Sequence, residues 1–64
     1  MNETAKGDIA EETISYLRKL VEEWPDNLPT YELPIRKRQL ELLERAIQSD
    51  KETAYKLAES FGIL

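Results

Sequence analysis

Apolar residues in the first third of the chain recur every three or four positions, which is typical of one face of an amphipathic helix. This series consists of Ile9, Ala10, Ile14, Leu17, Leu20, Val21 and Trp24. Asp8 and Glu11 have the spacing of an N-terminal capping box, in which side-chain oxygens accept free backbone N–H groups. Pro25 disfavours helical backbone at the residue before it. The pattern therefore predicts a helix over about 9–23, preceded by a flexible leader at 1–8.

A second wide apolar face follows a connector that contains prolines, residues 24–33. The large apolar residues of this connector are Trp24, Leu28, Tyr31 and Leu33. Because a solvated linker rarely carries four such side chains, we expect the connector to pack onto the core. Pro34 suits the first position of a helix, where its missing N–H would form no intrahelical bond. The apolar positions after this proline predict a helix over about 34–48.

A third helix follows almost without a loop. Ser49 and Glu52 form an S-x-x-E capping box, which marks a helix start. Gly62 suits the residue in left-handed conformation that commonly follows the last turn of a helix. The predicted third helix spans about 50–61. We therefore expect an all-α fold of three helices in one domain over 9–64.

The sequence contains neither cysteine nor histidine. Disulfides, thiolate or imidazole metal ligands, and nucleophiles activated by histidine are therefore excluded. Neighbouring helical residues do not face each other, so the acid pairs Glu11–Glu12 and Glu22–Glu23 do not converge on a site. A domain of this size also rarely encloses a ligand pocket of ~300 Å³. We expect no catalytic residue, no cofactor, no metal ion and no small-molecule substrate.

Thirteen acidic and nine basic residues give the chain a formal net charge of −4. This sign disfavours attraction to nucleic acid and to anionic membrane surfaces. No stretch approaches the ~18 apolar residues of a transmembrane helix, and the polar amino-terminal residues do not form a secretory signal. We therefore expect a cytoplasmic protein, and its small size is typical of bacterial or phage products.

The chain is short for a core that must be stable alone. Below ~70 residues a single core rarely supplies more than about 3–5 kcal/mol, and the composition excludes a disulfide or a zinc site as a supplement. The apolar spacing of the first helix suits a seam between two chains and core packing within one chain equally well. A homodimer is therefore one hypothesis, with the first helix buried together with Phe61, Ile63 and Leu64.

These exclusions favour a small non-enzymatic protein–protein interaction module, such as a regulator, inhibitor or adaptor of the antitoxin, immunity or phage-modulator type. Aromatic residues dominate the binding energy of interfaces. The candidate partner-binding residues are Trp24, Leu28, Tyr31, Tyr55, Phe61, Ile63 and Leu64. A basic cluster at an unfavourable helix start is a candidate contact for an acidic partner, although burial of its aliphatic stems is the simpler explanation. This cluster consists of Arg36, Lys37 and Arg38.

Two alternatives remain open. Residues 57–63 resemble the first helix and turn of a helix-turn-helix unit, which would imply DNA binding. The phosphate contacts would then be Arg36, Lys37, Arg38 and Arg45. The recognition helix of such a unit would have to follow, but the chain ends at Leu64, and any amphipathic helix with a glycine cap produces the same string. The second alternative is a structural subunit of a larger assembly.

Overall fold

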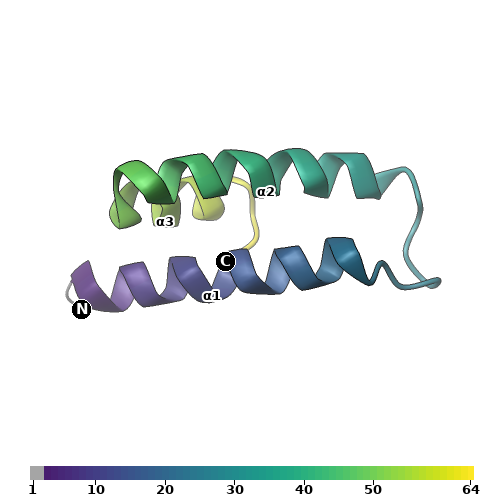
Figure 1. Ribbon diagram of the computed structural model, residues 1–64, viewed down its shortest axis with the longest axis horizontal. Coiled ribbons are helices and arrows are strands. Elements are labelled where there is room, and N and C mark those ends of the chain that lie inside the picture. Colours follow the sequence, from purple (N-terminus) through teal and green to yellow (C-terminus); the bar gives the residue numbers. More distant parts are fainter. Residues whose placement is uncertain (1–2) are drawn as a thin grey trace.

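The three apolar series form three helices in the computed structural model, which describes residues 3–64. Helix α1 spans Glu3–Glu22, α2 spans Glu32–Ser49 and α3 spans Lys51–Ser60, and the described residues contain no strand. α1 and α2 form an antiparallel hairpin, and α3 packs against both of them at one end (Figure 1). The predicted all-α fold with three helices is therefore confirmed.

Helix α1 begins at Glu3, six residues earlier than predicted. Asp8 consequently lies inside the helix, and its predicted role in a capping box is wrong. Gly7 explains the earlier start: a Cβ on this buried residue would lie 2.8 Å from Cδ of Lys51, so its missing side chain lets α1 approach α3 closely. Packing of this kind stabilises helices that propensity alone does not. Residues 1–2 of the predicted leader lie outside the described residues.

The connector leads into α2 through a series of tight turns. The backbone N–H groups of Leu28, Glu32 and Leu33 each donate to the carbonyl three residues earlier, at 3.1–3.2 Å. α2 therefore begins at Glu32, two residues before the predicted start at Pro34. Pro34 is still in the first turn, where backbone N–H groups have no intrahelical acceptor, so the proline costs no hydrogen bond there.

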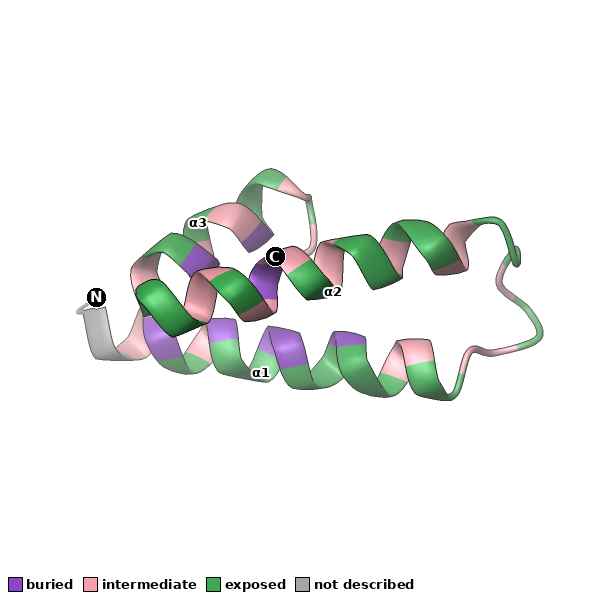
Figure 2. Cartoon of the chain, turned by 45° about the horizontal axis from the view of Figure 1, so that its top comes forward, coloured by how far each residue is buried: buried purple, intermediate pink, exposed green. Residues whose placement is uncertain are grey.

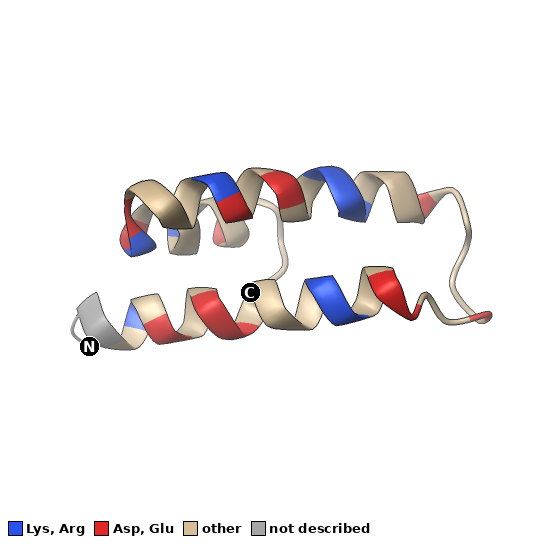
Figure 3. Cartoon of the chain, viewed as in Figure 1, with Lys and Arg blue, Asp and Glu red and all other residues tan. Residues whose placement is uncertain are grey.

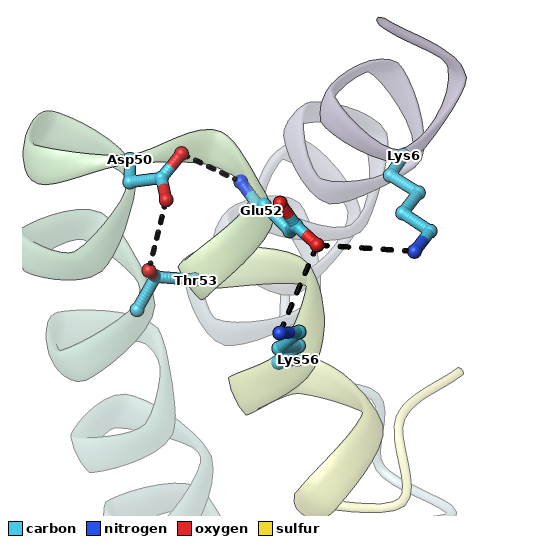
Figure 4. A network of polar contacts seen from close by, with 5 residues as sticks. All are labelled: Lys6, Asp50, Glu52, Thr53 and Lys56. Carbon is cyan, nitrogen blue, oxygen red and sulfur yellow. Dashed lines mark hydrogen bonds and ion pairs between the residues drawn. The ribbon is translucent and has the colours of Figure 1, made fainter. Parts of the chain in front are cut away.

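Asp50 separates α2 from α3 and caps both. It has extended backbone, its N–H donates to the carbonyl of Ala46 at 2.9 Å, and its carboxylate accepts from the N–H of Glu52 at 3.2 Å. The hydroxyl of Thr53 donates to the other carboxylate oxygen, also at 3.2 Å (Figure 4). The N-cap is thus Asp50 and not Ser49, because Ser49 is the last helical residue of α2.

Gly62 ends α3 in the predicted left-handed conformation, with φ of +77°. The N–H of Gly62 donates to the carbonyl of Glu59 at 3.0 Å, and the N–H of Ile63 donates to that of Ala58 at 3.1 Å. These two bonds define a Schellman motif. The motif reverses the chain and brings Ile63 against the core.

The buried residues gather in the half of the molecule that α3 covers (Figure 2). The buried apolar residues are Ala10, Ile14, Leu17, Leu43, Ala54 and Ala58. Thr13 is also buried, and its hydroxyl donates to the carbonyl of Ile9 at 2.8 Å. Beyond Leu17, no described residue of α1 is fully buried. The core is therefore confined to one end of the hairpin.

Helix lengths explain this asymmetry. At a rise of 1.5 Å per residue, the 20 and 18 residues of α1 and α2 extend about 30 and 27 Å, whereas the 10 residues of α3 extend about 15 Å. The molecule measures 37 × 17 × 17 Å, and the carboxyl terminus lies beside the middle of the hairpin (Figure 1). We call residues 16–39 the open half; it begins where α3 ends, and Leu17 at its border still packs in the core with Ala58 of α3.

Removing the Asp50 carboxylate tests the assignment of the cap. We expect Asp50→Ala to lower the free energy of unfolding by about 1 kcal/mol, because an N-cap acceptor contributes about 0.5–2 kcal/mol. Ser49→Ala is the matched control and should change it by less than about 0.5 kcal/mol. Urea unfolding followed by circular dichroism measures both, and a larger loss for Ser49→Ala would contradict the assignment.

A substitution at Gly62 tests the left-handed end of α3. A Cβ on Gly62 would meet no atom within 4 Å, so the cost of Gly62→Ala is conformational and not steric. We expect this variant to lose about 1 kcal/mol of unfolding free energy. Gly62→Asn should lose less, because asparagine tolerates the left-handed region. Equal stability of the alanine variant and the wild type in urea unfolding would show that this conformation is not required.

Candidate functional site

A cavity of about 320 Å³ lies where α3 ends. Both helices of the hairpin, the connector and the carboxyl-terminal turn contribute to its walls. The lining residues are Tyr16, Leu17, Leu20, Trp24, Leu28, Glu32, Arg36, Gly62 and Ile63. Tyr16 and Leu20 are four residues apart on α1, so they share the side of the helix that faces this cavity. The open half thus has a hollow lined by both apolar and charged side chains, in the position that a longer third helix would fill.

The large apolar residues that face solvent also belong to this region. Tyr16 is 61% exposed, Tyr31 73%, Ile35 52% and Leu64 48%. The first three lie in the open half, and Leu64 follows the carboxyl-terminal turn at its border. Single exposed apolar residues are ordinary on protein surfaces, whereas several in one region of the surface are typical of an interaction site.

Trp24 has a polar atom without a partner. Its indole nitrogen is buried, and no acceptor in the described residues lies within hydrogen-bond distance. A buried donor without an acceptor costs about 1–3 kcal/mol. This cost falls on a residue that lines the cavity, so the open half is the less stabilised part of the fold.

The basic cluster is paired with groups on its own helix. Arg36 donates to the side-chain oxygen of Gln39 at 2.9 Å and lies 4.0 Å from the carboxylate of Glu32. Arg38 lies 3.6 Å from the carboxylate of Glu41. Acidic residues therefore flank the cluster on both sides along α2 (Figure 3). The cluster does not form a single positive surface.

The structure brings together four of the residues that the sequence singled out. Trp24, Leu28, Ile63 and Arg36 all line the cavity. Two more, Tyr31 and Leu64, are exposed in or beside the open half. The other four do not line the cavity and are placed as follows: Phe61 packs against the core, Tyr55 lies on α3, and Lys37 and Arg38 are exposed on α2.

Sequence reasoning missed several residues of this site. Tyr16, Leu20 and Glu32 line the cavity but were not among the candidates, and Ile35 is exposed although the apolar pattern assigned it to a helix face. The spacing of Tyr16, Leu20 and Trp24 was a usable signal, because residues four apart share one side of a helix. The exposure of Ile35 had no sequence signal, since it follows from the length of α3.

A second hollow, of about 660 Å³, lies between α1 and α2 and is bordered by charged residues. Two ion pairs connect elements across it: Arg18 lies 2.6 Å from Glu44, and Lys51 lies 2.9 Å from Glu11. These four side chains are all about half exposed. Exposed pairs of this kind contribute little to stability, because water and salt screen the charges. Because the charges satisfy one another, this hollow is a weaker candidate site than the cavity.

A smaller set of polar contacts joins α1 to α3. The carboxylate of Glu52 lies 4.0 Å from Nζ of Lys6 and 3.7 Å from Nζ of Lys56 (Figure 4). The Lys6 ammonium also lies 5.7 Å from the centre of the Tyr55 ring, within reach of a cation–π interaction. Tyr55, a predicted partner-binding residue, is thus engaged by a side chain of its own chain.

Within residues 3–64, no group of three or more acidic side chains is placed to hold a metal ion. None of the three helices combines the length and the hydropathy that crossing a membrane requires. Comparison of the chain with protein-family models, curated proteins and solved structures found no match.

The contact between Lys51 and Glu11 predicts a pH dependence. The hydrogen bond that the Lys51 ammonium donates to the carboxylate of Glu11, the negative charge of Glu11 and that of Asp8 raise the pKa of Lys51 above its ordinary value of 10.5, against an opposing effect of desolvation. Because this pKa is raised, the contact between Lys51 and Glu11 contributes fully to the stability of the fold below pH 10.5. This contribution is lost as the pH rises through the pKa of Lys51 in the folded state.

We therefore expect the stability advantage of the wild type over Lys51→Met to shrink above pH 10.5. Urea unfolding across this range measures the difference. Lys37→Met removes an exposed lysine that forms no ion pair within the described residues, and its difference from the wild type should change less with pH. A constant advantage over Lys51→Met at all pH values would contradict the raised pKa.

Proposed function

We propose that this chain is a small non-enzymatic protein–protein interaction module that docks through its open half. The proposal rests on three exposed large apolar residues of the open half, Tyr16, Tyr31 and Ile35, of which Tyr16 also lines the cavity. Tyrosine and tryptophan are enriched among the residues that dominate binding energy. A module with this surface acts by covering or being covered by another protein, as regulators, inhibitors and adaptors do.

The energetics of the fold support the same proposal. Among the described residues, the core holds six buried apolar residues, three of which are alanines, so the folded chain has little stability to spare. A partner that binds only the folded state stabilises it by mass action. Covering Tyr16 and Ile35 would also remove apolar surface from water. Function and stability would thus depend on the same surface.

The interpretation as a DNA-binding protein has less support than the interpretation as a protein interaction module. Arg36 and Arg38 are paired with acidic residues of α2, and the chain has a net charge of −4. The string at 57–63 is accounted for by the last turn of α3 and its Schellman motif. The absence of cysteine and the acidic composition are consistent with the cytoplasm of a bacterial or phage-infected cell as the compartment of action.

A substitution in the open half tests this proposal. We expect Tyr16→Glu to weaken binding to a partner at least about tenfold, because it places a charge in the apolar contact. Ser15→Glu introduces the same charge at the neighbouring exposed position, beside the charged hollow, and should leave binding unchanged. Capture by the immobilised chain from host extract, followed by mass spectrometry and titration of the captured protein, measures both.

Circular dichroism should show the same helical content in both variants, since Tyr16 and Ser15 are exposed. Equal capture of every partner by Tyr16→Glu and Ser15→Glu would contradict docking through the open half.

A further inference from the structure

α3 forms a second layer over one half of the hairpin and then stops, so the molecule has the shape of a step. The floor of the step is the open half, and its wall is the carboxyl-terminal end of α3 with the residues that follow (Figure 1). We propose that a second copy of this chain fills the step, in a symmetric dimer. This inference rests on the function proposed above and names the partner of that surface.

The shape of the step favours a second copy. The uncovered part of the hairpin is about as long as the covered part, since α3 is about half as long as α1. A two-fold axis across the floor therefore lays one open half on the other, with the helices antiparallel. Each copy then supplies the missing second layer of its partner, and the connector of one copy meets the end of α3 of the other. An interface of this kind uses the same patch on both copies.

The exposed apolar residues occupy the places that this arrangement covers. Tyr16 lines the cavity beside the wall, Ile35 belongs to the part of α2 in the open half, Tyr31 lies at the connector end of the hairpin, and Leu64 follows the wall. The two-fold axis brings floor to floor, and it brings Tyr31 of each copy toward Leu64 of the other. These four are all of the exposed large apolar residues in the described chain, and one symmetric contact covers them.

Charge also favours a second copy at this surface. The open half, residues 16–39, contains five basic and four acidic residues, whereas the rest of the chain carries a formal net charge of −5. Two copies that meet through their open halves bring nearly neutral surfaces together. Their acidic ends lie at opposite ends of the dimer, where their repulsion is largely screened by salt. Two copies that met through the rest of the chain would instead bring together parts that each carry a net charge of −5.

The accessible area is sufficient for such an interface. The chain exposes 4532 Å², compared with about 4,250 Å² for a compact monomer of this mass. A stable interface buries about 800 Å² on each partner, which is about one sixth of this surface. The open half makes up about half the length of the molecule, so the required area is available there.

Sedimentation equilibrium of the full chain at micromolar concentrations tests the proposal. We expect twice the monomer mass of 7.5 kDa for the wild type. Ile35→Glu should raise the dissociation constant at least about 100-fold, because the symmetric interface contains the substitution twice. Ser15→Glu should remain dimeric. A wild type that stays at 7.5 kDa, or an Ile35→Glu variant that dimerises normally, would overturn the inference.

Cross-linking tests the orientation, because the chain has no cysteine of its own. We expect an equimolar mixture of Tyr31→Cys and Leu64→Cys chains to form an intermolecular disulfide on mild oxidation, whereas Tyr31→Cys alone should not. A dimer without this mixed cross-link would overturn the proposed arrangement. A monomeric wild type together with loss of another captured protein in Tyr16→Glu would refute the dimer and leave the proposed function in place.

Discussion

The packing of α3 onto one end of the α1–α2 hairpin is the contact on which the rest of the structure depends. It buries Leu17 and Leu43 beneath Ala58, and Gly7 permits the close approach at its amino-terminal end. Asp50 begins α3 directly after α2, and the Schellman motif at Gly62 ends it after ten residues. These two caps fix how far the second layer extends. The core, the cavity and the exposed apolar surface all follow from that length.

The sequence predicted the number of helices and the end of α3 because these depend on local chemistry. Apolar spacing within each helix and the left-handed preference of Gly62 are readable from neighbouring residues. The helix starts were placed less well, since α1 extends back to Glu3 through packing of Gly7 against Lys51, which are far apart in the sequence. Ser49 and Asp50 are both good caps, and the position of the single extended residue decides between them.

The residues of the candidate site divide in the same way, into those predicted from neighbouring residues and those that depend on packing between helices. The connector residues Trp24 and Leu28 were predicted to lie in a contact region, because large apolar residues in a loop must be covered. Tyr16 and Ile35 were not among the candidates, because each belongs to an amphipathic helix whose pattern does not show which part is left uncovered. Their exposure follows from the end of a different helix, α3, halfway along the hairpin. No pattern within α1 or α2 contains that information.

We infer that the open half is the surface through which two copies of this chain associate. Backbone amide chemical shifts of the isotope-labelled chain, recorded over a range of protein concentrations, test it most directly. We expect concentration-dependent shifts at residues 16–39 and 61–64, and constant shifts at Ile9, Thr13 and the α3 residues that already pack against the hairpin. Shifts that do not change with concentration, or that change along the charged hollow around Ser15 and Gln48, would contradict the account.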